Sequence, residues 1–432
     1  MHKTDRAIAR LAVPALGSLA VEPLYVLVDT AIVGRIGTAE LAGLGLASTV
    51  LLVAFAVFNF LAYGTTPRVG FLYGRGDLRG AAGVAVQGLW ASAVIGAASV
   101  AVLLAGGSHV LRALGGEGAV LTNAETYLRI SALGVPAVLV ALVGHGYLRG
   151  LQDTRTPLVV AAVANALNLV VELWLVFGLG LGIAGSAWST VIAQWVAAAW
   201  FLVLIVRDVS RRDATLRPLP DELRRLATTG RHLVVRTGAL LGAFVVASAV
   251  AARIGAATLA AHQIAFQVFT FLALAVDALA IAGQALVAKA LGAGDVAEVR
   301  ATSDRLIRFG LACGVVLAAA LLIGSRALPA VFTPDGDVRT RATQALVVLA
   351  LMQVPAAVVF VLDGLLLGAS DTRFLQWGTV AGLAVFAPLG AGVLRLPKPA
   401  IGWLYGGLTV WMLVRLAFNG LRYRSGAWLG SG

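Results

Sequence analysis

Long apolar segments alternate with short polar stretches along the whole chain. Each segment holds roughly 20 residues or more, about the length that a helix needs to cross the hydrocarbon core of a membrane. The approximate bounds of the twelve segments are 8–36, 44–69, 81–106, 123–149, 157–178, 182–206, 229–254, 258–289, 301–327, 342–368, 372–395 and 399–421. The pattern predicts an all-α integral membrane protein with twelve transmembrane helices.

Short motifs in the polar stretches recur at one fixed offset of 218 residues (253 − 35, 292 − 74 and 364 − 146). The matching stretches are Arg35-Ile36-Gly37 with Arg253-Ile254-Gly255, Gly74, Gly76 and Asp77 with Gly292, Gly294 and Asp295, and "GYLRGLQDTR" (146–155) with "GLLLGASDTR" (364–373). Three ungapped matches at half the chain length indicate an internal duplication.

The duplication predicts the domain organisation. The most charged stretch, 207–228, separates two sets of six apolar segments. We therefore expect an N-terminal six-helix lobe (1–206), a linker (207–228) and a C-terminal six-helix lobe (229–432). Because six is even, both copies enter the membrane from the same side, which makes the repeats parallel.

The composition agrees with a membrane protein. Hydrophobic residues make up 59% of the 432 residues, charged residues only 12%, and the mean hydropathy is +0.91. Soluble domains carry about twice that charged fraction. The single cysteine, Cys313, excludes an intrachain disulfide and a cysteine-based metal site. The basic N-terminus resembles a signal peptide, but the apolar stretch behind it is long and holds acids, so we interpret it as an uncleaved first helix.

The formal charge of +12 raises the question of nucleic acid, but the basic residues lie in short loops. Their distribution fits topology signals near anionic lipid better. One side of the predicted topology collects 24 of the 33 Lys and Arg residues. The positive-inside rule then places both termini and the linker in the cytoplasm.

Five acidic residues interrupt the apolar segments, namely Glu22, Asp29, Glu172, Asp277 and Asp363. A carboxylate near the bilayer centre costs at least about 2.5 kcal/mol, so each needs a partner, a water-filled cavity or a proton. Intramembrane acids are by default candidates for function. The alternative is an acid that pairs with another helix or caps a loop.

Depth groups Asp29 with Glu172 and Thr190. Asp29 lies seven residues before the end of the first segment, about 10 Å below its outer end at 1.5 Å per residue, and the other two reach a similar level. Asn168 stands one turn before Glu172, and Tyr25 one turn before Asp29, on the same helix faces. Glu22 shares nearly the same face as Asp29. Pro14 can kink the first helix below them.

The duplication separates these acids into two groups. The counterparts of Glu22, Asp29 and Glu172 are Leu240, Ala247 and Gly390, so this cluster occurs in one copy only. A charge needed by the fold would be expected in both copies, which favours function for Asp29 and Glu172, while Glu22 is evenly balanced between function and structure.

Asp277 and Asp363 instead correspond to Asn59 and His145, so polarity is shared at these positions. For them, a structural role, as interhelical hydrogen bonding or interfacial capping, and a function are equally good explanations. His145, His232 and His262 lie near predicted helix ends without metal-ligand spacing, and we interpret them as interfacial. In the two "DTR" turns, the aspartate can cap the following helix.

No enzyme motif withstands inspection. "GRIG" and "GRGD" are glycine-containing turns outside any strand–helix unit, so they do not predict phosphate loops. A membrane enzyme would lack a catalytic constellation, and a channel gives no simple account of the parallel duplication.

Four stretches carry a family resemblance. "LVDTAIVGRIGTAELAGLGLA" (27–47), "LAAHQIAFQ" (259–267), "VDALAIAGQALVAKALGAGD" (276–295) and "LDGLLLGASDTR" (362–373) resemble the multidrug and toxic compound extrusion (MATE) family, in particular its DNA-damage-inducible protein F branch. The resemblance covers the whole chain in order. It implies two six-helix lobes around a central cleft and cation-coupled export of organic compounds.

The resemblance also implies a proton site in the N-terminal lobe. The residues that match the pattern of that branch are Asp29, Tyr25, Asn168, Glu172, Thr190 and Tyr127. Glu172 departs from the pattern, in which aspartate is usual, so the acid is kept but lengthened by one methylene. We expect Asp29 to hydrogen-bond with Tyr25, Asn168 and Thr190.

The leading hypothesis is a drug/proton antiporter of the bacterial inner membrane. It would be monomeric, without a bound cofactor or nucleic-acid partner, and its substrates would be small organic compounds. Sodium is an alternative coupling ion, because carboxylate and carbonyl oxygens also suit it. A lipid-linked oligosaccharide flippase of the same superfamily is the other alternative. It would need a cationic cavity for a pyrophosphate, and we expect almost no Lys or Arg inside the apolar segments.

Overall fold

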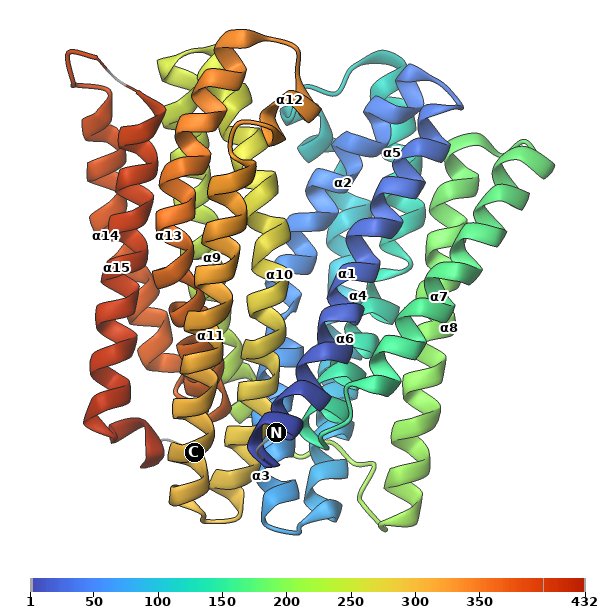
Figure 1. The fold of residues 1–432 in the computed structure, drawn as a ribbon. Helices are drawn as coiled ribbons and strands as arrows, with labels where there is room; N and C mark the ends of the chain where they lie inside the picture. Colours follow the sequence, from blue (N-terminus) through green and yellow to red (C-terminus); the bar gives the residue numbers. More distant parts are fainter. Residues whose placement is uncertain (1–2, 399, 431–432) are drawn as a thin grey trace. The chain divides into compact units, whose positions relative to one another are not determined.

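The computed structural model describes residues 3–398 and 400–430, and in these residues it contains helices and turns but no strand (Figure 1). The helices that precede the middle of the chain are α1 (Lys3–Gly34), α2 (Thr38–Phe58), α3 (Phe60–Gly74), α4 (Leu78–Ala113), α5 (Gly118–Ala132), α6 (Val135–Gly150), α7 (Arg155–Leu173), the π-helical turn η1 (Trp174–Gly178) and α8 (Gly182–Arg211). The helices that follow are α9 (Pro220–Ile254), α10 (Ala256–Gly292), α11 (Val296–Gly324), α12 (Leu328–Phe332), α13 (Gly336–Gly368), α14 (Thr372–Val393), α15 (Ile401–Ser425) and the 3₁₀ turn η2 (Ala427–Gly430).

The predicted set of transmembrane helices is confirmed. Among the described residues, eleven segments are long and apolar enough to cross a membrane, and α5 with α6, bent by 49° at a short break, makes a twelfth. One of the eleven is α2 with α3, which meet at Asn59. The chain is therefore a multi-pass, all-helical membrane protein.

The helices form two compact units. The N-terminal unit is Val13–Gly230, and the C-terminal unit is Arg231–Gly432 together with Met1–Ala12. The first part of α1 thus belongs to the C-terminal unit, where Arg305 forms two hydrogen bonds with Asp5 (2.6 and 2.9 Å). The predicted N-terminal lobe, 1–206, instead included the whole of the first helix. The two units are described separately below.

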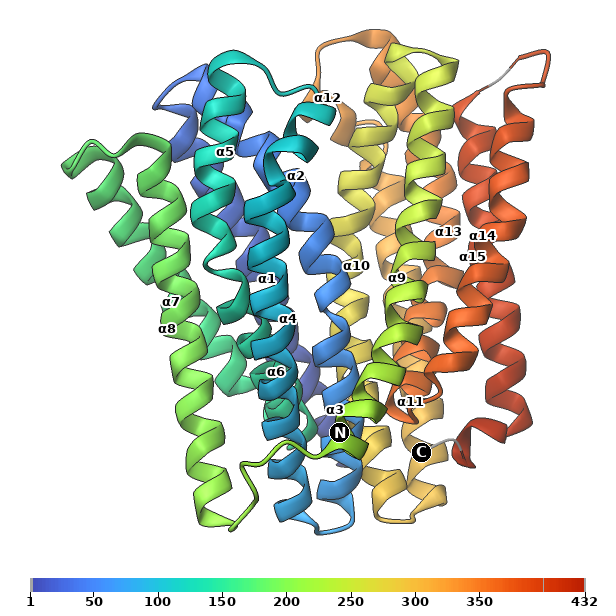
Figure 2. The ribbon, with the colours of Figure 1, turned by 180° about the vertical axis from the view of Figure 1, so that it is seen from behind.

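The stretch predicted as a linker is mostly helical. Because α8 runs to Arg211 and α9 begins at Pro220, only 212–219 lies outside a helix, within the N-terminal unit (Figure 2). The buried amide of Gln87 accepts a hydrogen bond from the Leu219 N–H (2.8 Å) and donates one to the Arg217 carbonyl (3.1 Å). Trp90 donates to the Leu216 carbonyl (3.0 Å). These contacts fix the connection against α4.

The duplication is visible in the turns and helix contacts of both units. Asp77 and Asp295 each cap the following helix through the backbone N–H three residues on, at 2.7 and 2.8 Å. Equivalent glycines allow equivalent helices to touch. A Cβ atom at Gly146 would lie 3.0 Å from the Ala62 carbonyl oxygen, and one at Gly364 would meet the Ala280 carbonyl oxygen at 2.4 Å. Small residues at such crossings let membrane helices approach closely.

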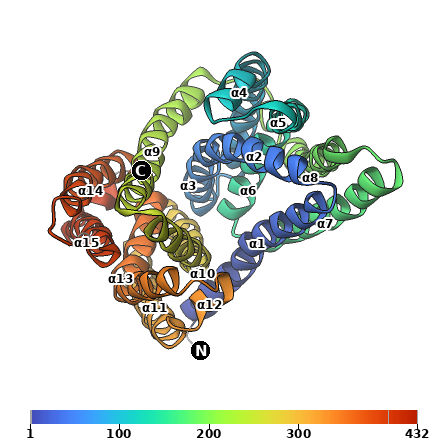
Figure 3. The same cartoon turned by 90° about the horizontal axis from the view of Figure 1, so that it is seen from above.

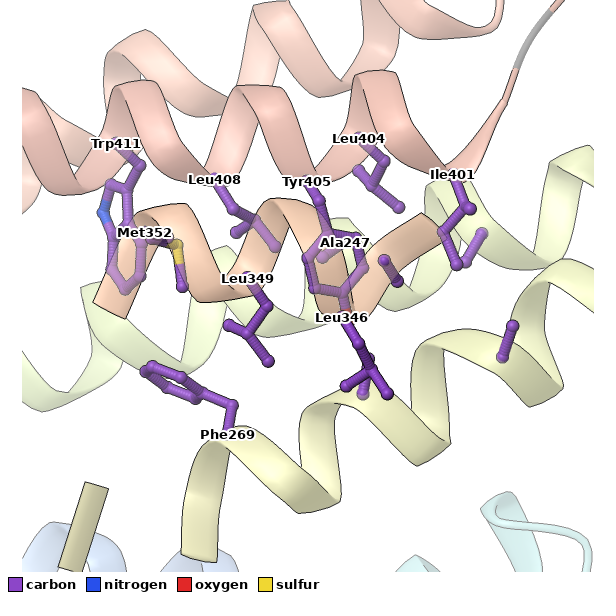
Figure 4. Close-up of a cluster of buried hydrophobic side chains, with 14 of the residues drawn as sticks. Ala247, Phe269, Leu346, Leu349, Met352, Ile401, Leu404, Tyr405, Leu408 and Trp411 are labelled. Carbon is purple, nitrogen blue, oxygen red and sulfur yellow. The ribbon is translucent and has the colours of Figure 1, made fainter. Parts of the chain in front are cut away.

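Each unit has its own apolar core. In the N-terminal unit, α3 and α4 pack against α6, α2 packs against α5, and α7 lies beside α8 (Figure 3). In the C-terminal unit, α13 packs against α10, α11 and α15, and α14 pairs with α15. Figure 4 shows buried side chains from this second core, including Phe269, Leu349 and Trp411.

Candidate cation-coupling site

Two carboxylates from different helices lie together inside the N-terminal unit. Asp29 on α1 is 5% exposed, and Glu172 on α7 is fully buried. The two side chains are close enough to interact electrostatically. Ser186 on α8 donates a hydrogen bond to Oδ1 of Asp29 (2.7 Å). Three helices therefore converge on one acidic pair.

A chain of hydrogen bonds surrounds the pair. The Thr190 hydroxyl donates to the Ser186 carbonyl (3.1 Å). Its oxygen then accepts from the Tyr25 hydroxyl (2.8 Å) and more weakly from the Asn168 amide (3.4 Å). A hydroxyl has one proton to donate, so Tyr25 is the donor in its contact with Thr190. Asp29 is connected to Tyr25, Asn168 and Thr190 through Ser186. Direct hydrogen bonds from Asp29 to these three residues were predicted from the sequence.

Several polar atoms in and next to this cluster make no hydrogen bond of good geometry among the described residues. They are both carboxylate oxygens of Glu172, Oδ1 of Asn168 and Oγ of Ser131, and all are buried. Buried polar atoms in proteins are nearly always satisfied, and exceptions need an explanation. No Lys or Arg side chain in the described N-terminal unit is buried. Two adjacent buried carboxylates without a cationic side chain are suited to hold a proton or a small cation.

Tyr127 belongs to the same cluster. Its phenol on α5 is 5% exposed and interacts electrostatically with Asp29 and Glu172. Aromatic hydroxyls next to the acids can donate hydrogen bonds to them without adding charge.

A cavity of about 300 Å³ opens beside the cluster. Tyr25, Asn168 and Thr190 face both the cluster and the cavity. The other lining residues are Glu22, Phe55, Asn59, Val138, Ala141, Leu142, His145, Ala161, Ala164, Asn165, Ala193, Gln194 and Ala197. Pockets of this size and mixed polarity can take a small organic molecule.

The structure brings most of the predicted residues together. Tyr25, Asp29, Tyr127, Asn168, Glu172 and Thr190 form the cluster. Glu22 lines the cavity with an exposed side chain. Pro14 lies inside α1, near the start of the N-terminal unit, and Pro23 is a second proline within the same helix.

The remaining two candidates belong to the C-terminal unit. Asp277 is half-buried on α10. Asp363 on α13 is buried in an ion-pair cluster, in which it accepts hydrogen bonds from Arg236 (2.7 Å), Arg415 (2.6 Å) and Asn419 (2.7 Å). These contacts support an interhelical structural role for Asp363.

The arginines of this ion-pair cluster correct one expectation. Almost no basic side chains were expected inside the apolar segments, yet Arg236 and Arg415 lie there and are only 8% and 3% exposed. Their positions within predicted membrane segments are evident from the sequence, but their acidic partner lies on a distant helix. Buried basic side chains are therefore absent only from the described N-terminal unit.

Three residues of the site were not predicted from the sequence, namely Ser186, the direct partner of Asp29, and the cavity residues Asn165 and Gln194. A signal was available, because Ser186 and Gln194 stand four residues before and after Thr190, on the same face of one helix. Asn165 likewise stands three residues before Asn168.

The histidines are more internal than predicted. His145 lines the cavity, and His262 is 1% exposed between the hydroxyls of Ser248 and Tyr405 (3.1 Å each). His232 contacts the Thr372 hydroxyl (3.3 Å).

The two "DTR" turns behave differently. Asp153 caps α7 through the backbone N–H groups of Arg155 and Thr156 (3.0 Å each). Its counterpart Asp371 accepts a hydrogen bond from Arg422 (2.7 Å) and makes no capping bond. Capping is thus confirmed for the first copy and wrong for the second.

The place equivalent to the acidic cluster in the C-terminal unit is apolar. Asp29, Ser186 and Thr190 correspond at the 218-residue offset to Ala247, Leu404 and Leu408, which are labelled in Figure 4 and buried in one hydrophobic cluster. The fold therefore does not require charged side chains at this position. This supports a functional role for Asp29 and Glu172 in the N-terminal unit.

Comparison with known proteins places these features in a family. A sequence model of the MatE family matches residues 14–174 and 239–391. The chain is 32% identical to Protein DETOXIFICATION 44, chloroplastic, of Arabidopsis thaliana (99% of this chain, 85% of the relative). It is 28% identical to DNA damage-inducible protein F of Escherichia coli (100% and 95%) and 30% identical to the probable multidrug resistance protein NorM of Deinococcus radiodurans (94% and 91%).

Solved structures show the same fold. A MOP superfamily transporter from Pyrococcus furiosus superimposes with a TM-score of 0.90 at 20% identity, over 99% of this chain and 97% of that one. A MATE structure in the bent conformation gives 0.91 at 21% identity, over 99% and 96%. The chain thus belongs to the MatE family of multidrug and toxic compound extrusion transporters.

Proposed function

We propose that this transporter exports small organic compounds, in particular lipophilic cations, in exchange for protons that bind at Asp29 and Glu172. The observation that carries the proposal is the buried acidic pair, which has no buried Lys or Arg in the described N-terminal unit. Two adjacent carboxylates in a low-dielectric interior cannot both stay ionised without a large cost, and a shared proton removes it.

The hydrogen-bond chain gives the proton a means to act on the helices. When Asp29 is ionised, it holds the Ser186 hydroxyl and so connects α1 to α8 (2.7 Å). A protonated Asp29 is a weaker acceptor, which loosens this contact and lets α1 bend about Pro14. In this scheme protonation from outside favours substrate release, and proton loss to the cytoplasm favours binding of the next substrate.

The energetics are sufficient for export. One proton that moves inward down 100 mV supplies about 2.3 kcal/mol, enough for roughly a fifty-fold uphill ratio of a neutral substrate exchanged one for one. The cavity beside the cluster is the proposed substrate site, with the Glu22 carboxylate available to a cationic group. We further propose a monomer in the bacterial plasma membrane, with both termini in the cytoplasm.

The test uses purified protein in vesicles loaded with ethidium. A proton gradient and a sodium gradient are applied separately, because the same oxygen atoms also suit sodium. We expect transport with the proton gradient, and a protonophore should abolish it. Transport with the sodium gradient alone would overturn proton coupling. Absence of both, with translocation of a lipid-linked oligosaccharide, would favour the flippase.

Substitution of the acids tests the site itself. We expect Asp29→Asn to abolish gradient-driven transport, because the amide mimics the neutral state permanently, and Glu172→Gln to impair it less completely. Asp337→Asn is the matched control, since Asp337 is exposed and its carboxylate forms an ion pair with Arg341, one helical turn later, at 3.0 Å. Wild-type transport by Asp29→Asn would show that this carboxylate is structural.

A further inference from the structure

The cavity of the N-terminal unit has a counterpart position in the C-terminal unit. Three small lining residues, Ala164, Ala193 and Ala197, correspond at the 218-residue offset to Gly382, Trp411 and Arg415. His145, which also lines the cavity, corresponds to Asp363. The offset holds into the last helix of each copy, because buried Ile183 corresponds to buried Ile401 near the start of α8 and α15.

Large side chains occupy the counterpart position. Trp411 is 1% exposed and lies against Gly382, where an added Cβ atom would be 3.0 Å from Cδ1 of Trp411. The guanidinium of Arg415 lies 5.1 Å from the centre of the Trp411 ring. On its other side, Trp411 borders a pocket of only about 10 Å³ that it shares with His262 and Tyr405, room for a single water molecule at most. Where the first copy has three small residues around a cavity, the second has a stacked Trp–Arg pair.

Asp363 anchors the pair. Its Oδ2 accepts hydrogen bonds from Arg415 (2.6 Å) and Arg236 (2.7 Å), and its Oδ1 accepts one from Asn419 (2.7 Å). Charge-assisted bonds of this length hold a guanidinium in a fixed orientation. The indole N–H of Trp411 has no hydrogen-bond partner among the described residues. The contribution of Trp411 is therefore the volume that it fills.

We infer that the C-terminal unit carries a closed copy of the substrate cavity, with Trp411 and Arg415 as its plug and Asp363 as the anchor of that plug. The residue types at 193 and 197, and at 411 and 415, then decide which copy can take a small lipophilic cation. Each chain would thus bind one such ligand in the N-terminal unit. The inference rests on the proposed function only for the class of ligand.

Transfer of the plug tests the open copy. Ala193→Trp places an indole where the cavity now lies, and we expect it to lower equilibrium binding of ethidium to the detergent-purified protein at least ten-fold. Ala199→Trp is the matched control, because Ala199 is exposed on the same helix and does not line the cavity. Binding by Ala193→Trp as tight as in Ala199→Trp would overturn the inference. No ion gradient is present, so the result does not depend on coupling.

Removal of the plug tests the closed copy. In Trp411→Ala/Arg415→Ala, Asp363 keeps Arg236 and Asn419 as partners, and we expect the number of bound ethidium molecules per chain to rise from one to two. A structure of the variant should show a cavity lined by Gly382, Asp363 and the two new alanines. If the double variant does not fold, Trp411→Leu should open a smaller cavity in the same place.

The structural measurement also separates the two proposals. If the helices of the variant collapse and no cavity forms, the inference is wrong, whatever the transporter exports. If the cavity forms but neither the wild type nor the variant binds ethidium, the inference that Trp411 and Arg415 fill a second copy of the cavity is supported. The proposed substrate class is then wrong.

Discussion

Glu172 and Asp363 are both buried acids, and their hydrogen-bond partners indicate different roles for the two carboxylates. Glu172 is fully buried beside Asp29, and neither of its oxygens makes a hydrogen bond of good geometry among the described residues. Asp363 is also buried, but two arginines and one asparagine satisfy it. An acid without such partners is unfavourable for stability and is available for ion binding, whereas a paired acid is needed to compensate its arginines.

Replacement of the acid by its amide should affect stability in opposite directions at positions 172 and 363. We expect Glu172→Gln to leave the thermal unfolding temperature in detergent unchanged or raise it, because an amide cannot ionise next to the buried Asp29 carboxylate. Asp363→Asn should destabilise by about 3–5 kcal/mol, because it leaves buried arginines uncompensated. Glu117→Gln, at an exposed position, is the control. A marked destabilisation by Glu172→Gln would point to a structural Glu172.

Several of the helices that line the candidate site are interrupted or bent. Asn59 lies between α2 and α3 and faces the cavity. α5 and α6 bend by 49° at their junction, and α7 continues into the π-helical turn η1 just after Glu172. α1 contains two prolines, Pro14 before Glu22 and Pro23 directly after it. Such irregularities commonly occur at functional sites and allow local bending.

Pro14 is the predicted hinge of α1. Pro14→Ala restores a backbone N–H that can bond to the carbonyl four residues earlier, so we expect equal or greater thermal stability together with slower transport in vesicles. Pro388→Ala changes a proline inside α14 of the C-terminal unit and should have less effect on transport. A Pro14→Ala protein with wild-type transport rates would exclude a hinge role.

The whole molecule combines two copies of one six-helix pattern that have diverged in opposite directions. The N-terminal unit keeps a buried acidic pair and an open cavity. The C-terminal unit fills the equivalent positions with apolar side chains and with an arginine-rich ion pair. Divergence of this kind concentrates the proposed ion binding in the N-terminal unit.

Orientation in the membrane is a property of the whole chain. The excess of basic residues on one side predicts that both termini and the 207–228 stretch are cytoplasmic. In a Cys313→Ala background, Ser210→Cys should react with an impermeant thiol reagent only after the cells are opened. Labelling in intact cells would reverse the orientation and with it the direction assigned to proton movement.

The sequence by itself determined the helical spans, the duplication and the faces that carry Asp29, Tyr25, Asn168 and Glu172. These features follow from periodicity and spacing within single helices, which are local properties. The offset of 218 residues also showed that the acidic cluster occurs in one copy only.

Only the tertiary structure decided which side chains meet across helices. Ser186 reaches Asp29 over 157 positions of sequence, and Arg236 reaches Asp363 over 127. The closing of the second cavity likewise depends on how Trp411, Arg415 and Gly382 pack against one another. Helix periodicity gives the face on which a residue lies, but the partner on that face depends on the packing of helices that are far apart in the chain.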